Sequence, residues 1–207
     1  MKKLLTLLFS LLFLSSSSVF ADDISDFEIE GISIGDSLLD YMTEDEILEE
    51  IENTKYWYQY LNEPNKYAEV NVLTDRRKYD FVSVFIKNTS INQYMSKKDE
   101  KFTILAIRGS ITKNINSDSC IKERDEIIEI FSQLLPDRKK TEHLYSNGAD
   151  PSGESIIDAI HLDKLPSEGV RIACVYWEEN YRIKNNFLDN LSVVIETGEI
   201  IDWTSDY

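Results

Sequence analysis

The sequence has 207 residues, of which 38 are Asp or Glu and 22 are Lys or Arg, so its formal net charge is −16. So acidic a chain is not expected to bind nucleic acid, because binding requires Lys and Arg to neutralise phosphates, and anionic lipid surfaces would repel it. Hydrophobic residues make up 42% of the chain, which is ordinary for a globular protein and excludes disorder throughout.

The N-terminus has the three parts of a secretory signal peptide. A positive Met-Lys-Lys start precedes an almost wholly apolar run at 4–14, and the small residue Ala21 precedes Asp22. This run is shorter than the roughly 20 apolar residues that span a bilayer. We therefore predict cleavage between Ala21 and Asp22, after a signal peptide at 1–21. Neither cysteine lies near that site, so the mature chain is expected to be periplasmic or secreted, without a membrane anchor.

Acidity is concentrated in the first part of the mature chain. Residues 22–63 hold fourteen acids and one base, Lys55, and so carry −13, whereas residues 64–207 hold twenty-four acids and nineteen bases and carry −5. The simplest interpretation is a solvated acidic face that keeps an exported protein in solution. Binding of a cationic partner or of divalent ions is the alternative.

The first half of the mature chain predicts a helix followed by strands. Residues 28–34 alternate weakly as a strand does, and a helical turn follows at 36–42. Thr43 with Glu46 three residues later forms a capping box, which starts a helix that runs to about Asn53. Strands are expected at 67–73, 79–87 and 102–111, with a polar loop at 89–101.

The second half repeats the order of helix and then strands. Apolar spacing predicts the strongest helix at 120–135, capped by Asp118 or Ser119 and ended by Pro136. A charged turn is expected at 137–140. Strands are expected at 154–163 and 170–177, and a hairpin at 191–196 and 200–203 across Thr197-Gly198-Glu199.

This order of elements predicts an α+β fold, in which helices pack on one face of an antiparallel sheet. The mature chain, 22–207, is expected to be a single domain. Its candidate subunits are two helix-then-strands units, 28–111 and 118–203.

Two stretches resemble an uncharacterised family of small exported bacterial proteins: IEGISIGDSLLDYMTEDEI at 29–47, and IRGSI at 107–111 ahead of a helix that begins with a cysteine. The resemblance covers most of the mature chain and implies no assigned activity. A fainter likeness is to the outer-membrane assembly lipoprotein BamE and the β-lactamase-inhibitor proteins, which also start with a Gly-led helical pair and continue into antiparallel strands. The Gly-x-Pro and the lipid-anchor cysteine are missing here. This likeness concerns fold, which does not carry function.

The two cysteines predict a disulfide. Cys120 begins a predicted helix, and Cys174 lies on the apolar face of the strand at 170–177. Cysteines of exported proteins usually pair, and closing a loop of about 55 residues would stabilise the fold by roughly 4 kcal/mol. Two buried free thiols are the alternative. The absence of a C-x-x-C motif argues against a redox-active pair.

The sequence contains no Walker loop and no G-x-G-x-x-G, and no catalytic residue and no cofactor is predicted. His161 and Asp163 are the best pair of metal ligands, but a zinc site needs three or four. The oxygen-rich loop at 147–154 could hold Ca²⁺, although its spacing differs from that of an EF-hand. The acids of 44–52 could pair for hydrolysis, yet most fall on the solvent side. A surface loop and a solvated helix face are the simpler interpretations.

The densest aromatic cluster consists of Tyr56, Trp57, Tyr58 and Tyr60. Aromatic residues beside acids can form a recognition surface for a protein or a sugar, or they can divide between the core and its cover. The favoured hypothesis is a non-catalytic, soluble exported protein that binds or modulates another envelope protein. The alternatives are a periplasmic hydrolase, with or without a metal, that uses His161 and carboxylates, and a binder of cations or small ligands at the acidic stretch.

Overall fold

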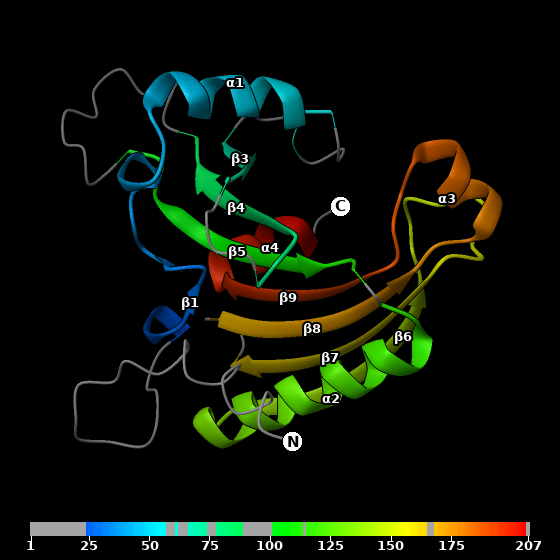
Figure 1. Cartoon of the computed structure of the whole chain (residues 1–207). Helices are drawn as coiled ribbons and strands as arrows, with labels where there is room; N and C mark the ends of the chain where they lie inside the picture. Colours follow the sequence, from blue (N-terminus) through cyan, green and yellow to red (C-terminus); the bar gives the residue numbers. More distant parts are fainter. Residues whose placement is uncertain are drawn as a thin grey trace.

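The computed structural model describes residues 24–56, 61, 66–73, 78–88, 101–113, 115–164 and 168–205. Within them, seven strands form one antiparallel sheet, and helices pack against it (Figure 1). The α+β prediction is therefore confirmed. The predicted cleavage site, Ala21 and Asp22, lies outside the described residues. Across the sheet the strands are, in order, β3 (Tyr67–Asn71), β4 (Phe81–Lys87), β5 (Ile104–Ile111), β9 (Asn190–Thr197), β8 (Glu168–Tyr176), β7 (Ile156–Lys164) and β6 (Lys139–Ser146).

One continuous apolar core lies on one face of this sheet. Because side chains alternate along each strand, one set of inward residues runs through the register from Val70 and Val84 to Ile195 and Val170. Strand β5 pairs with β9, so strands from 28–111 and 118–203 belong to the same sheet. Two groups of elements cover this face, one N-terminal and one formed by the long helix α2.

The N-terminal group consists of η1 (Ile24–Asp26), β1 (Glu28–Ile29), β2 (Ile32–Ser33), η2 (Leu38–Asp40) and α1 (Glu44–Thr54). The weak alternation over 28–34 corresponds to two short strands, because Glu30 and Gly31 both adopt positive φ and turn the chain into a two-stranded hairpin. The predicted Thr43–Glu46 capping box is present at the start of α1. Buried Ile47 and Ile51 join α1 to the core.

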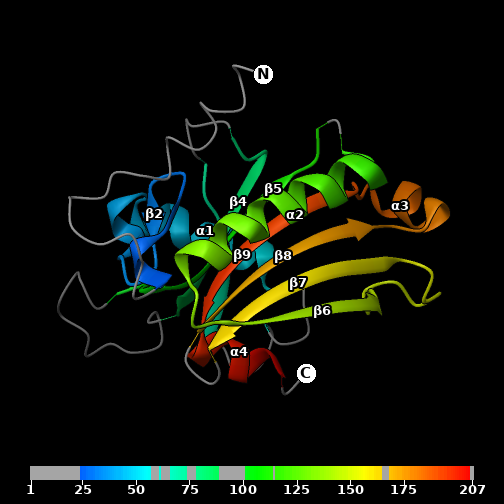
Figure 2. The ribbon, with the colours of Figure 1, turned by 90° about the horizontal axis from the view of Figure 1, so that it is seen from below.

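Helix α2 (Ser117–Leu134) lies across β7, β8 and β9 (Figure 2). It begins three residues earlier than predicted, and its cap is Asn116 instead of Asp118 or Ser119. The Asn116 side chain accepts a hydrogen bond from the backbone N–H of Ser119, whose hydroxyl in turn accepts one from the backbone N–H of Asn116. A capping box formed by Asn and Ser therefore fixes the start of this helix.

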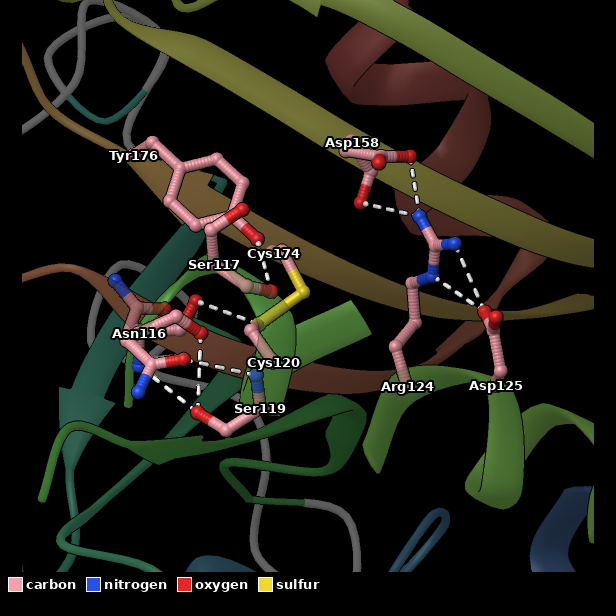
Figure 3. The surroundings of a disulfide bond; sticks show 10 residues. Asn116, Ser117, Ser119, Cys120, Arg124, Asp125, Asp158, Cys174 and Tyr176 are labelled. Atoms are coloured by element: carbon pink, nitrogen blue, oxygen red, sulfur yellow. Dashed lines mark hydrogen bonds and ion pairs between the residues drawn. A yellow bond between two sulfur atoms is a disulfide. The ribbon is translucent and has the colours of Figure 1, made fainter. Parts of the chain in front are cut away.

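Cys120 on α2 and Cys174 on β8 lie at disulfide distance, as the sequence predicted, with an S–S distance of 2.06 Å (Figure 3). Both are fully buried. Nearby, the hydroxyl of Tyr176 donates to the Ser117 carbonyl oxygen at 3.2 Å. Arg124, one helical turn beyond Cys120, pairs with a carboxylate of β7 (Figure 3). These contacts attach the N-terminal half of α2 to the sheet.

The expected hairpin at 191–196 and 200–203 was wrong in its second strand. Residues 198–205 form helix α4 (Gly198–Ser205), which packs on the face opposite α2. There Ile200 is buried and Trp203 contacts the Tyr67 ring, with 4.7 Å between ring centroids. The hydroxyl of Tyr67 also donates to the Glu199 carboxylate at 2.6 Å. Spacing of three residues between Ile200 and Trp203 fits one side of a helix.

Two further elements were not expected. The stretch predicted as a charged turn at 137–140 leads into β6, which pairs with β7 over eight consecutive residue pairs. After β8 the chain forms the short helix α3 (Glu179–Asn185) at one end of the sheet (Figure 1). Among the described residues, no helix is long and apolar enough to cross a membrane.

Candidate functional site

The second face of the sheet, over β6, β7 and β8, has partly exposed side chains. Helix α4 covers one end of it, where the Cδ1 atom of Ile201 would lie 3.4 Å from a Cβ atom placed on Gly169. Away from α4, the register aligns rows of side chains across the three strands. We call this surface the open face, and it comprises Thr141, His143 and Tyr145 of β6, Ile157, Ala159 and His161 of β7, and Arg171, Ala173 and Val175 of β8.

Small residues occupy the middle row of the open face. Ala159 and Ala173 lie opposite each other and are buried, and Ser192 continues the row on β9. The rows on either side carry larger groups, with Arg171 on one side and Tyr145 on the other. These larger side chains reach solvent to different degrees, so a ligand on this surface would meet aromatic, cationic and imidazole groups.

The chain has two histidines, and the structure brings their rings together at a tilted angle on the open face. The rings of His143 and His161 have centroids 4.6 Å apart. The Nε2 atom of His143 lies 3.0 Å from the Thr141 hydroxyl, and the Nδ1 atom of His161 lies 3.9 Å from a carboxylate oxygen of Asp163. The Nε2 atom of His161 is buried and has no hydrogen-bond partner in the described structure.

Burial keeps the imidazole of His161 uncharged. It lowers the pKa of His161 to about 4, and the charge of Arg171 and the neighbouring His143 act in the same direction. Burial also raises the pKa of Asp163, as does the negative charge of Glu196. His161 is therefore neutral at pH 7, and its partly exposed imidazole packs within the face as an uncharged ring.

An aromatic cluster borders the open face at the end opposite α4. Trp177 directly follows β8, and its ring lies 5.9 Å from that of Tyr181 and 4.5 Å from that of Phe187, between centroids. The Trp177 backbone N–H donates to Asp189 at 2.9 Å. Phe187 and the neighbouring Leu188 are exposed. Large apolar groups therefore remain accessible where the open face ends.

The predicted aromatic surface is described only at its first member. Tyr56 is 73% exposed, with the ammonium nitrogen of Lys55 lying 4.9 Å from its ring centroid. Trp57, Tyr58 and Tyr60 lie outside the described residues. Tyr56 follows α1, which packs beside β3 at the far edge of the sheet from β6. The open face is thus a separate surface, and the density of aromatic residues along the sequence did not reveal it.

The candidate ion sites have internal partners. His161 and Asp163 do approach each other, but the described residues contain no group of three or more His, Cys, Asp or Glu side chains that could hold a metal ion. In the loop at 147–154, Asp150 accepts hydrogen bonds from the hydroxyls and backbone N–H groups of Ser152 and Ser155, which lower its pKa to about 2. The Asp150 carboxylate therefore organises its own loop.

The acids of α1 also have local partners. Glu46 completes the helix cap, Glu44 pairs with Lys101 at 3.1 Å, and Glu50 accepts a hydrogen bond from Asn71 at 3.0 Å. These contacts attach α1 to its surroundings. They do not bring two carboxylates together in an arrangement that the hydrolase hypothesis would need.

No family model, no curated protein and no solved structure matches this chain.

Proposed function

We propose that this chain is an exported, non-catalytic recognition module that binds another envelope protein through the open face. The observation that supports the proposal best is the composition of that face, where Arg171 and Tyr145 stand beside a row of small residues and Trp177 borders one end. Tyr, Trp and Arg are the residues that most often dominate binding energy at protein interfaces. Their grouping on one surface favours a protein ligand.

The state of the two histidines favours recognition over hydrolysis. A general base must reach the proton that it removes, but the Nε2 atom of His161 is buried. Its other ring nitrogen faces Asp163, and the neighbouring hydroxyl, that of Thr141, contacts His143. This arrangement fits a packed pair of rings better than an acid–base centre.

The disulfide supports export to an oxidising compartment, because paired, fully buried cysteines are typical of such proteins. We place the mature protein in the periplasm or outside the cell, after removal of residues 1–21. Mass spectrometry of the exported protein tests this. A chain that begins at Asp22 supports the proposal, and a chain that retains Met1 contradicts it.

Site-specific photocrosslinking in the producing cells tests the recognition surface. A photoreactive residue in place of Val175, which lies on the open face two strands from the sheet edge, should give an adduct of one defined mass. Arg171→Glu in the same chain should weaken that adduct. The matched control places the photoreactive residue at Lys122, which is exposed on α2 over the other face.

Equal adducts from Val175 and Lys122, or none from Val175, would contradict recognition through the open face. An adduct of twice the chain mass from Val175 would mean that the open face contacts a second copy instead of another protein.

A further inference from the structure

The two edge strands of the sheet, β3 and β6, differ in length and in how far they are buried. Strand β3, at one edge, has five residues, four of them buried, and α1 packs beside it. The Thr54 hydroxyl of α1 donates to the Glu69 carbonyl oxygen of β3 at 2.5 Å, which engages part of its backbone. Strand β6, at the other edge, has eight residues, and all except Thr141 are exposed.

An edge strand presents half of its backbone N–H and C=O groups outward, where another strand can pair with them. Proteins usually protect long edges with charged side chains, bulges, prolines or covering elements, and β6 carries charged side chains of both signs. The pairing of β6 with β7 is continuous over eight positions without a bulge, and β6 contains no proline. Both views show β6 at the margin of the sheet (Figures 1 and 2). The fold therefore offers β6 as a straight pairing edge.

We propose that β6 pairs antiparallel with β6 of a second copy of this chain. The two-fold axis of such a pair is perpendicular to the sheet, so each residue faces one that points to the same side. With Thr141 on the axis, Lys140 faces Glu142 of the second copy, and the symmetry makes this contact twice. Pro136, which lacks a backbone N–H, limits the pairing at the start of the strand.

Charge complementarity favours a second copy as the occupant. Lys140 and Glu142 are 45% and 74% exposed in their side chains, and their charged atoms are only 3.8 Å apart within one chain. Opposite charges directly across a strand pair stabilise it, whereas like charges destabilise it. An edge that carries one of each at adjacent positions of the same face is complementary to itself.

The overall negative charge does not prevent this pairing. The acidic helix α1 lies at β3, which is six strand positions from β6 in the sheet order. At about 4.8 Å per strand this distance is roughly 29 Å, and charges beyond about 8 Å are largely screened at physiological ionic strength. Pairing through β6 would therefore keep the two acidic regions at opposite ends of the joined sheet.

The same symmetry places both open faces on one side of the joined sheet. A dimer would thus offer two copies of the proposed recognition surface side by side, which raises avidity for a partner with two binding positions. The proposed pairing of β6 is argued from the strand edge alone and does not depend on the proposed function. The advantage in avidity does rest on the proposed function.

Sedimentation equilibrium of the purified protein and of charge variants tests the pairing. We expect a monomer–dimer equilibrium with a dissociation constant of about 10–100 µM, as suits a short interface. Lys140→Glu and Glu142→Lys should each weaken the dimer roughly tenfold or more, because each creates two like-charge contacts. The double variant Lys140→Glu/Glu142→Lys should restore it, and mixing the two single variants should give heterodimers.

Two controls carry the same changes in charge away from β6. Lys122→Glu on α2 and Glu49→Lys on α1 should leave the dissociation constant unchanged. A protein that stays monomeric to about 1 mM, or a dimer that the β6 variants do not weaken, would overturn the proposal. A dimer that the single variants weaken and the double variant fails to restore would overturn the Thr141-centred register. Loss of photocrosslinking at Val175 with the dimer intact would count against the proposed function only.

Discussion

Removal of the disulfide is the perturbation whose magnitude follows most directly from the structure. Cys120 and Cys174 are 54 positions apart in the sequence. Crosslinking a loop of this length lowers the entropy of the unfolded chain by an amount worth about 4 kcal/mol at 25 °C. Replacing both with alanine in Cys120→Ala/Cys174→Ala also removes two buried sulfur atoms, which adds roughly 1 kcal/mol for the space they leave. We therefore expect the free energy of unfolding to fall by about 4–5 kcal/mol.

Urea unfolding followed by circular dichroism measures this change. The loop-entropy term alone should lower Tm by roughly 8–16 °C for a chain of this size. The dependence of the unfolding free energy on urea should steepen, because the unfolded chain without the crosslink exposes more surface. As a control, a reductant should destabilise the wild-type protein by most of the same amount and leave the double variant unchanged.

A loss smaller than about 1 kcal/mol in the double variant would contradict stabilisation through loop entropy. It would mean that the unfolded chain is already compact around Cys120 and Cys174, or that the crosslink strains the folded state enough to cancel its entropic contribution. A reductant that destabilises the double variant would show that the measured effect does not come from this bond.

Three further predictions concern single side chains. Gly109→Ala would place a Cβ atom 2.5 Å from the Tyr79 ring, so it should cost about 1–3 kcal/mol in urea unfolding, and less in a Tyr79→Leu background. Asn116→Ala removes the cap of α2 and should cost about 1 kcal/mol in the same assay, while a cost near zero would deny the cap its role. Because the folded pKa of His161 is about 4, below its ordinary 6.5, the unfolded state binds more protons between these values. The stability present at pH 7 should therefore fall on acidification through that window, by roughly 1–2 kcal/mol for a partly exposed ring. His161→Gln should flatten the measured slope of unfolding free energy against pH, and an unchanged slope would exclude His161 as its source.

Elements with a local sequence signal could be predicted correctly. The capping box marks the start of α1, and it consists of only four consecutive residues, from Thr43 to Glu46. The alternation along 81–87 and the helical spacing along 120–135 reflect contacts with the same core, so β4 and α2 could be predicted without knowing their neighbours. Cys120 and Cys174 could be paired because the chain has two cysteines and both occupy apolar faces.

Elements whose structure depends on contacts with residues distant in the sequence could not be predicted. Strand β6 carries exposed side chains on both faces, so its sequence lacks the alternation that marks a half-buried strand. The run Ile200-Ile201-Asp202-Trp203 is too short to distinguish a strand from a helix by period. The contact of Trp203 with Tyr67, which lies on the same face of the sheet, favours the helix α4. Gly198 suggested a turn, but it begins that helix.

The open face could not be predicted from the sequence, because its residues come from strands that are distant in the chain. His143 and His161 are separated by eighteen positions and lie in ordinary surroundings in the sequence. Only the register of β6 against β7 brings their rings together. The residues of the run from Tyr56 to Tyr60 are adjacent in the chain, whereas a surface on a sheet is formed by alternate residues of several strands.

The two faces of the sheet differ in how much they contribute to stability, and this difference explains how the open face and β6 can remain exposed. The core on the α2 side is continuous from α1 to α2, and the disulfide attaches α2 to the centre of the sheet. Stability is therefore supplied mainly from one side, and the exposed groups of β6, such as Leu144 and Tyr145, bury little area that folding requires. Substitutions there should change association while leaving the free energy of unfolding within about 0.5 kcal/mol. Because the two effects separate in this way, loss of binding in a β6 variant can be assigned to the surface itself.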